Sequence, residues 1–157
     1  MEERWDIYDK NKQLTGRTMK RNDWTLKDDE YHLTVLGVIR RSDGKFLITK
    51  RVMTKAWAPG WWEVSGGAAQ AGEASYDAVL REVKEETGLT LTSYKLRGLV
   101  TFISDKCEPE LMCVFTANEY IGELTECNEG ELFEAEQCHS PHGECGLKLS
   151  EAAAIKT

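Results

Sequence analysis

A single stretch, residues 66–89, constrains the fold of this chain more than any other, because it joins a glycine-containing loop to a strongly patterned helix. Ser75 is a favoured N-cap residue and Gly88 suits the position after a helix end, so we predict a helix from about Ser75 to Thr87. The sector that would anchor this helix on a sheet is apolar and contains Tyr76, Val79, Leu80 and Val83.

Three glutamates occupy the neighbouring sector of the predicted helix. Glu82, Glu85 and Glu86 are spaced i, i+3 and i+4, and residues at that spacing share one helix face. Such like charges repel, and a bound divalent cation would remove the repulsion. A solvated acidic face is the general alternative for a helix of this kind. The glycines before the helix favour a cation site, because they let backbone carbonyls approach an ion closely.

The composition is that of one globular domain with an acidic balance. The chain has 157 residues, 41% of them hydrophobic, and its 20 Lys and Arg against 27 Asp and Glu give a formal net charge of -7. No basic stripe is visible, which argues against a general binder of DNA or RNA. We therefore expect that any anionic ligand is bound with the help of a cation.

Neither end of the sequence carries a recognisable targeting signal. The first residues are charged, and the longest nearly apolar run, Leu33 to Ile39, has seven residues, against roughly 20 for a membrane helix. The five cysteines are an odd number, and none precedes Cys107. We predict a cytoplasmic protein with reduced thiols that does not interact with membranes.

Strand signals surround the helix. We predict an N-terminal hairpin or arm over residues 1–30, a hairpin of buried strands with a turn at 42–44, and a short strand that ends in a flexible loop at 65–67. The predicted strands are Trp5–Tyr8, Leu33–Ile39, Phe46–Thr49, Trp61–Val64, Leu89–Leu91, Leu96–Ile103 and Leu111–Thr116. This order indicates an α+β domain with a mixed sheet.

The central stretch resembles the Nudix box, G-x5-E-x7-R-E-U-x-E-E-x-G-U, where U is aliphatic. Gly67, Glu73 and the run Arg81 to Leu89 match all nine defined positions. The wider resemblance covers about Tyr31 to Leu132. It implies a Nudix-like α/β/α sandwich with a mixed β-sheet and a central catalytic helix, organised as an arm at 1–30, a Nudix core at 31–132 and an atypical tail at 133–157.

The resemblance also implies an activity and a set of site residues. The expected activity is hydrolysis of a diphosphate bond in a nucleoside diphosphate derivative or a nucleoside triphosphate, with Mg²⁺ or Mn²⁺ as cofactor and a small-molecule substrate. By position, the resemblance gives Glu82, Glu85, Glu86 and the Gly66 carbonyl as metal ligands, Glu73 and Arg81 as the supporting pair beside Gly67, and Glu82 as a candidate base.

Two further groups of residues are weaker candidates. Members of the family often take another carboxylate from a later loop, for which Glu129 is our candidate and Glu126 the second, although an acidic surface loop fits this stretch equally well. Trp57, Trp61 and Trp62 precede the glycine loop, and Trp57 or Trp61 could stack on a nucleobase. Packing in the core or at its rim is the alternative for these tryptophans.

Four questions remain open from the sequence. The arm at residues 5–9 and Tyr31–Leu33 look like the isopentenyl diphosphate isomerase branch, but such isomerases need a cysteine in the first half of the domain, where this chain has none. A nucleotide sensor without activity is a second possibility. In the tail, Cys138, His139, His142 and Cys145 could bind zinc, although their compact spacing favours no metal. A homodimer is possible through exchange of the arm.

Overall fold

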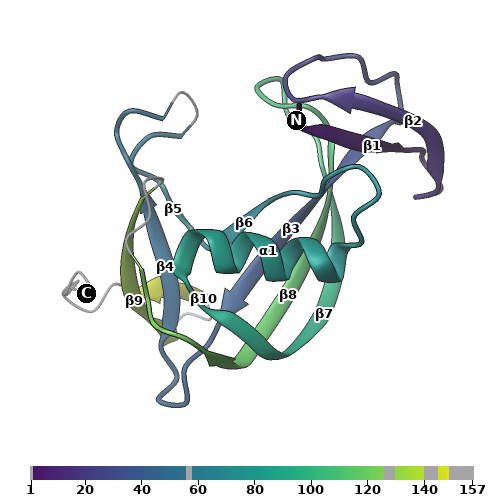
Figure 1. Ribbon diagram of the computed structural model, residues 1–157. Coiled ribbons are helices and arrows are strands. Elements are labelled where there is room, and N and C mark those ends of the chain that lie inside the picture. Colours follow the sequence, from purple (N-terminus) through teal and green to yellow (C-terminus); the bar gives the residue numbers. More distant parts are fainter. Residues whose placement is uncertain (1, 56–57, 126–129, 140–144, 149–157) are drawn as a thin grey trace. The chain divides into compact units, whose positions relative to one another are not determined.

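The computed structural model describes residues 2–55, 58–125, 130–139 and 145–148 (Figure 1). The chain divides into two compact units, which we describe separately. Unit 1 comprises residues 1–36, 66–82 and 96–115, and unit 2 comprises residues 37–65, 83–95 and 116–157. Several strands and the helix continue from one unit into the other.

The described elements are ten strands and one α-helix, in agreement with the predicted α+β class and its mixed sheet. In chain order they are β1 (Arg4–Tyr8), β2 (Leu14–Lys20), β3 (Tyr31–Ile39), β4 (Phe46–Arg51), β5 (Trp62–Glu63), β6 (Ser65–Ala68), α1 (Ser75–Thr87), β7 (Thr90–Phe102), β8 (Glu110–Ile121), β9 (Gly130–His139) and β10 (Cys145–Lys148). One sheet has the order β2-β1-β3-β8-β7, with β6 also paired to β3, and the other has the order β10-β9-β4-β5.

The predicted N-terminal hairpin is confirmed and belongs to the first sheet. Strands β1 and β2 pair antiparallel, with Trp5 opposite Met19, and β1 continues the sheet by placing Ile7 opposite His32 of β3. Trp5, Ile7 and Met19 are buried and form a small cluster. Trp5 also stacks on the buried His32 ring, with centroids 4.4 Å apart. The arm is therefore packed into unit 1 by apolar contacts.

The hairpin predicted around residues 42–44 is only partly present. The turn forms, with the Arg41 N–H donating to the Lys45 carbonyl at 2.8 Å and Gly44 at a φ of 89°. Pairing beyond it is limited to one bridge, between Arg40 and Phe46, because β3 and β4 enter different sheets. Strand β4 takes β5 and β9 as its neighbours instead.

Residues 65–67, predicted to be a flexible loop, form the strand β6 with Ala68. Strand β6 pairs with β3, and the Ala69 N–H donates to the Leu33 carbonyl at 2.9 Å. A Cβ atom at Gly66 would lie 2.1 Å from the Val35 carbonyl oxygen. Glycine is needed here for close approach of two backbones rather than for flexibility.

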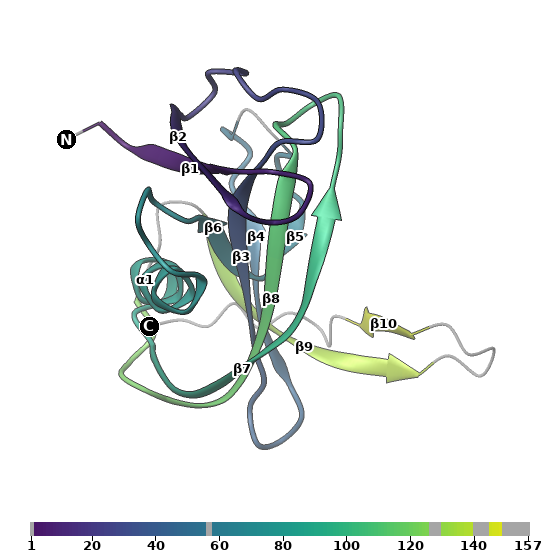
Figure 2. The same ribbon diagram turned by 90° about the vertical axis from the view of Figure 1, so that its right-hand side faces the viewer.

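Helix α1 has the predicted limits. Its residues Ala78, Val79 and Val83 are fully buried, and the Tyr76 ring meets Phe115 of β8 edge to face at 5.0 Å between centroids. Figure 1 shows α1 in front of the strands of the first sheet, and Figure 2 shows the same helix end-on. Gly88 follows the helix at a φ of 78°, as its predicted role after the helix end requires.

The second half of the chain contains longer strands than predicted. Strand β7 joins two predicted strands into one of 13 residues, and β8 has 12. Strand β9, which was not among the predicted strands, pairs with β4 along six positions. The tail predicted to be atypical also contains a second strand, β10. Helix α1, the one helix of the described residues, is too short and polar to span a membrane.

Candidate active site

Gly67 in β6 leaves room for a carboxylate of the helix. A Cβ atom at this position would lie 2.6 Å from the carboxyl carbon and from both oxygens of Glu82. The side chain of Glu82 is 14% exposed, so its carboxylate lies mostly enclosed against the backbone of β6. The requirement for glycine at this position of the motif is therefore steric, and its purpose is to admit Glu82.

Arg81 is the centre of the hydrogen bonds around this carboxylate. Its Nε and Nη2 donate to the two oxygens of Glu73 at 2.9 and 2.8 Å, which is a bidentate pair. Its Nη1 donates to Glu82 Oε1 at 2.6 Å, and its Nη2 also reaches the Ala68 carbonyl at 3.1 Å. Arg81 thus joins the loop, the strand and the helix, and it fixes the direction of the Glu82 carboxylate.

The Glu73–Arg81 pair is held in its charged form. Hydrogen bonds from Arg81, and then from the Gln70 N–H, lower the pKa of Glu73 below its ordinary value. The same contacts, led by Glu73, raise the pKa of Arg81. The side chains are 16% and 22% exposed, so solvent screens the pair less than it would a surface ion pair. Glu73 and Arg81 are therefore in contact, and their supporting role in the site stays a prediction.

The N-terminal arm holds the loop that precedes the helix, a role that the sequence did not reveal. Asp6 Oδ2 accepts a hydrogen bond from the Gly72 N–H at 2.7 Å, and the Arg4 carbonyl accepts one from the Ala71 N–H, also at 2.7 Å. Gly72 has a φ of 80°, which favours glycine. Strand β1 therefore positions the start of α1 as well as completing the sheet.

The other end of the motif fixes the end of the helix. Thr87 is buried, donates from Oγ1 to the Val83 carbonyl at 2.6 Å and accepts from the Leu89 N–H at 3.1 Å. Lys84 Nζ donates to the Gly88 carbonyl at 2.7 Å. A Cβ atom at Gly88 would lie 2.5 Å from the carbonyl oxygen of Glu123. These residues build the scaffold that carries the last turn of α1.

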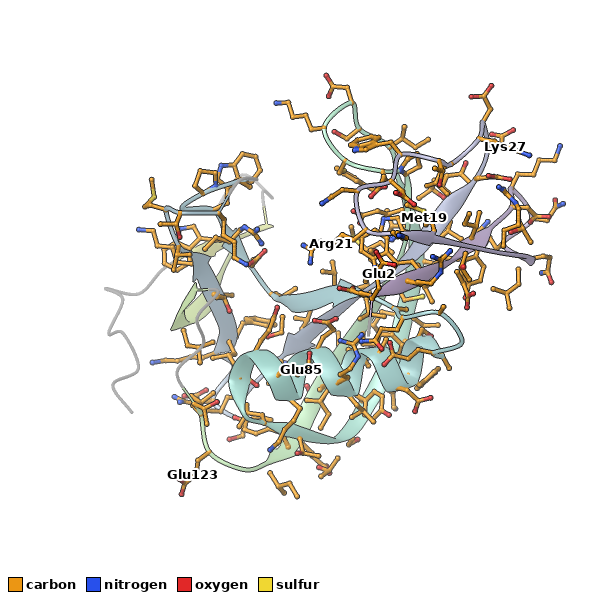
Figure 3. The ribbon with its side chains drawn as sticks, turned by 45° about the horizontal axis from the view of Figure 1, so that its top comes forward. Glu2, Met19, Arg21, Lys27, Glu85 and Glu123 are labelled. Carbon is orange, nitrogen blue, oxygen red and sulfur yellow. The ribbon has the colours of Figure 1, made fainter. Side chains whose placement is uncertain are left out.

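Glu85 and Glu86 lie on this last turn, three and four residues after Glu82. Glu85 is exposed and Glu86 is partly exposed. Figure 3 shows Glu85 projecting from α1, with Glu123 pointing away from it. The helix thus brings the three glutamates together on one face, as predicted from their spacing.

The oxygen donors on this face fit a hard divalent cation. Among the side chains that the structure describes, no three acidic, histidine or cysteine groups form a ready-made metal cage. Mg²⁺ does not need one, because it usually keeps several waters and binds to one or two carboxylates together with substrate phosphates. Glu82, with a fixed carboxylate, and the more exposed Glu85 and Glu86 suit that mode of binding.

The structure describes only some of the remaining predicted site residues. Gly66 lies in β6, and its role as a carbonyl ligand stays a prediction. Glu126, Glu129, Trp57 and His142 lie outside the described residues. Trp61 is 65% exposed, and its carbonyl accepts a hydrogen bond from the Arg51 N–H at 2.9 Å. Trp62 is less exposed, and Lys50 Nζ lies 5.3 Å from the centre of its ring.

Comparisons with known proteins agree with the motif and the fold. The sequence model of the NUDIX domain family matches residues 30–153. This chain belongs to the Nudix family. The sequence of the chain is 41% identical over 101 residues to that of an uncharacterized Nudix hydrolase of Listeria innocua. This match covers 64% of this chain and 59% of the relative. The chain is 34% identical over 107 residues to the Nudix hydrolase YvcI of Bacillus subtilis, covering 65% of each chain.

The Nudix chain thus spans about three fifths of the length of these curated relatives. It is also 35% identical over 63 residues to the nucleoside triphosphatase NudI of Escherichia fergusonii, covering 40% of this chain and 45% of NudI. Among solved structures, DR0079 of Deinococcus radiodurans has a TM-score of 0.61 at 26% identity and covers 83% and 82% of the two chains. MutT of Methanosarcina mazei Go1 has a TM-score of 0.57 at 28% identity, with coverage of 64% and 72%. The predicted Nudix fold is therefore confirmed.

Proposed function

We propose that this protein hydrolyses a diphosphate bond in a small nucleotide, either a nucleoside diphosphate derivative or a nucleoside triphosphate. The observation that carries the proposal is the Glu82 carboxylate, which Gly67 admits and Arg81 orients at 2.6 Å, on a helix that presents Glu85 and Glu86 one turn later. A scaffold that fixes one acidic group beside two exposed ones suits the binding of cations and phosphate oxygens.

Glu82, Glu85 and Glu86 would hold the divalent cation, Mg²⁺ or Mn²⁺, with the Gly66 carbonyl as a further ligand. Such a cation, when bound, neutralises charge on the diphosphate and makes water more acidic. The protein contributes the direction of the carboxylates, because Arg81 ties Glu82 to the loop through Glu73. Arg81 therefore acts as a positioning residue, whose loss would misdirect Glu82.

The proton of the attacking water would be accepted by a glutamate of the same helix face. Glu82 is the first candidate and Glu85 the second, because a carboxylate can act as general base when it lies within hydrogen-bond reach of the water. Water would then attack phosphorus, and the leaving phosphate would carry the charge that the cation neutralises. Glu129, which follows in a later segment, remains our candidate for an additional base or ligand.

The choice of a nucleotide substrate rests on the named activity of NudI as a nucleoside triphosphatase. A small-molecule substrate also agrees with the net charge of -7 and the lack of a basic stripe, which disfavour nucleic acid polymers. We further propose a cytoplasmic location and a homodimer.

Trp61, and with it Trp57, would provide a stacking surface for the nucleobase. Trp61 lies on the segment between β4 and β5 and is 65% exposed. Trp61→Ala should raise KM for a nucleotide several-fold and leave kcat nearly unchanged, because stacking contributes to binding of the base. Inorganic tripolyphosphate serves as the control substrate, since it lacks a base. An equal rise in KM for both substrates would contradict the stacking role.

The activity is tested with a substrate panel. Nucleoside triphosphates, nucleoside diphosphate sugars and dinucleoside polyphosphates are incubated with the protein and Mg²⁺ or Mn²⁺, and the released phosphate products are identified. Glu86→Gln should lower turnover roughly 100-fold or more while the fold remains intact. The matched control is Glu123→Gln, because Glu123 is an exposed glutamate that points away from Glu85 (Figure 3). Full activity of Glu86→Gln would contradict the proposal.

Two additions to the panel, isopentenyl diphosphate as a substrate and a binding measurement with ADP-ribose, separate the two other interpretations. Formation of an isomer of isopentenyl diphosphate without phosphate release would identify an isomerase. Binding of a nucleotide such as ADP-ribose, with no turnover in Mn²⁺, would identify a sensor. Hydrolysis that depends on the metal and on Glu86 is the result that we expect.

A further inference from the structure

Both basic residues of helix α1 are engaged by neighbouring groups of the chain. Arg81 donates hydrogen bonds to two glutamates and to a backbone carbonyl, and Lys84 donates to the Gly88 carbonyl. Sites that bind diphosphates commonly combine a metal ion with the side chain of an arginine or a lysine, because both neutralise phosphate charge. In the site proposed above, such a side chain would have to come from outside α1.

The N-terminal arm offers Arg21, the residue that directly follows β2. The basic residues within β1 and β2 are Arg4, Arg17 and Lys20, and each of them binds a neighbouring side chain. Arg21 is exposed, and its side chain forms no hydrogen bond or ion pair with any other residue that the structure describes. The N–H donors of its guanidinium group are therefore available to an anionic ligand.

The backbone around Arg21 is fixed on both sides of the residue. The Asp23 N–H donates to the Lys20 carbonyl at 3.3 Å, and Asp23 Oδ2 accepts from the Lys20 N–H at 3.2 Å. The Trp24 N–H donates to Oε1 of Glu108 at 3.0 Å, and Glu108 is 5% exposed. Trp24 has a φ of 48°, which a bulky residue adopts only where other contacts impose it. Because this turn is already ordered, binding of a ligand by Arg21 would cost little backbone entropy.

Arg21 also belongs to the same compact unit as the fixed carboxylates of the site. Unit 1 contains the arm, residues 66–68 of β6 and the part of α1 that ends at Glu82. Within this unit, the hydrogen bond between Asp6 and Gly72 joins the arm to the loop before α1. Figure 3 shows Arg21 pointing away from the strands of the arm, toward the side on which β6 and α1 lie, whereas Lys27 points outward. Arg21 therefore keeps a fixed position relative to Glu82, as a shared ligand would require.

We propose that Arg21 binds a phosphate group of the substrate, a role that rests on the diphosphate hydrolysis proposed above. A guanidinium group can donate two parallel hydrogen bonds to phosphate oxygens, and its charge strengthens both. The metal ion and Arg21 would contact different oxygens of the same substrate, so the metal should bind without Arg21. Arg21 would act on the affinity for the substrate rather than on bond cleavage, and its loss should change KM more than kcat.

Binding of methylenediphosphonate, a diphosphate analogue with a carbon bridge that water does not cleave, tests this role by titration calorimetry in saturating Mg²⁺. Arg21→Gln should weaken binding of the analogue at least tenfold, because it removes a charged hydrogen-bond donor, and should change Mg²⁺ binding less than about twofold. Arg21→Lys should lie between the wild type and Arg21→Gln, since it keeps the charge without the paired donors. The matched control is Lys27→Gln, which removes the same charge from the same connection and should weaken analogue binding less than about twofold. Circular dichroism confirms that each variant is folded.

Steady-state kinetics with the nucleotide that the substrate panel identifies supplies a second measurement. Arg21→Gln should raise KM at least tenfold and lower kcat less than about threefold. A KM equal to that of the wild type, an equal loss of analogue binding in Lys27→Gln, or an equal loss of Mg²⁺ affinity in Arg21→Gln would overturn the role of Arg21 and leave the proposed hydrolysis intact. A wild type that hydrolyses no substrate of the panel and does not bind the analogue would overturn the proposed function, and this inference with it.

Discussion

The two ends of the Nudix motif differ in what surrounds their acidic side chains. Glu73 and Glu82 are less than one fifth exposed, and Arg81 binds both of them. Glu85, one turn later, is exposed on the surface of α1. The motif therefore contains two kinds of glutamate: Arg81 holds Glu73 and Glu82 in fixed positions, whereas Glu85 lies exposed on the surface of the helix.

Gly66, directly before the motif, and Gly67, its first residue, also have different roles. Gly66 lacks a side chain because the backbone of Val35 occupies that space, whereas Gly67 lacks one because the Glu82 carboxylate does. Gly88 supports the end of the helix at a positive φ. Adjacent positions with the same residue type thus serve the fold in one case and the site in the other, and substitutions should separate these roles.

The largest expected effect comes from the two adjacent glycines. Gly66→Ala should lower the free energy of unfolding by about 3 kcal/mol, because its Cβ would collide with backbone that cannot move without disturbing β3. Gly67→Ala should cost less than about 1 kcal/mol, since the Glu82 side chain can move, but turnover should fall roughly 100-fold because the carboxylate is displaced. Urea denaturation and steady-state kinetics measure the two quantities. Equal stability losses in both variants would contradict the division.

An intermediate effect is expected at the scaffold glutamate. Glu73→Gln should lower the free energy of unfolding by about 1–2 kcal/mol at neutral pH, because the hydrogen bonds to Arg81 lose one of their two charges. Exposed Glu85→Gln is the matched control and should change stability by less than about 0.5 kcal/mol. A Glu73→Gln variant as stable as the wild type would remove the scaffold role of this pair.

The difference between wild type and Glu73→Gln should depend on pH. Because the pKa of Glu73 is lower in the folded chain than its ordinary value, the ionised carboxylate stabilises the fold above the ordinary range, about pH 4.3. This contribution is lost as the pH falls through the folded pKa. The free energies of unfolding of the two proteins, measured by denaturation, should therefore converge at acid pH. A difference that stays constant across the pH range would show that the charge of Glu73 does not cause the loss of stability.

The smallest effect is expected where the arm contacts the loop. Asp6→Ala removes the acceptor for the Gly72 N–H and should lower the free energy of unfolding by about 1 kcal/mol, with a loss of turnover of a few-fold. Asp6→Asn keeps an acceptor oxygen and should behave nearly as the wild type. Thermal denaturation measures the stability of the two variants, and steady-state kinetics measures their turnover. A larger loss in Asp6→Asn than in Asp6→Ala would contradict the role of this hydrogen bond.

The sequence predicted the helix with its limits, because an N-cap, a terminal glycine and an i, i+3, i+4 spacing all act within one segment. The pairing of Glu73 with Arg81 was expected from the resemblance to the Nudix box, and the two side chains are hydrogen-bonded in the structure. The sequence did not predict β6, because glycine indicates flexibility and close backbone approach equally well. Only the position of Val35 decides between them.

Contacts between distant residues were also beyond prediction. Asp6 and Gly72 are 66 positions apart, and nothing in either segment points to the other. Strand β9 was not among the predicted strands, yet it pairs with β4 and places Phe133 opposite Ile48. In such cases a neighbouring strand, rather than the local propensity, determines the structure.

Binding of Mn²⁺, measured by titration calorimetry, tests most directly whether the two kinds of glutamate have different functions. Wild type, Glu85→Gln and Glu73→Gln are compared, with Glu123→Gln as the control for a change of charge. Glu85→Gln should weaken Mn²⁺ binding at least tenfold, because it removes a ligand oxygen, whereas Glu73→Gln should weaken it less than about threefold, as a residue that acts through Arg81. Equal affinities of Glu85→Gln and wild type, or a greater loss in Glu73→Gln than in Glu85→Gln, would contradict the assignment of Glu85 as a metal ligand and of Glu73 as a supporting residue.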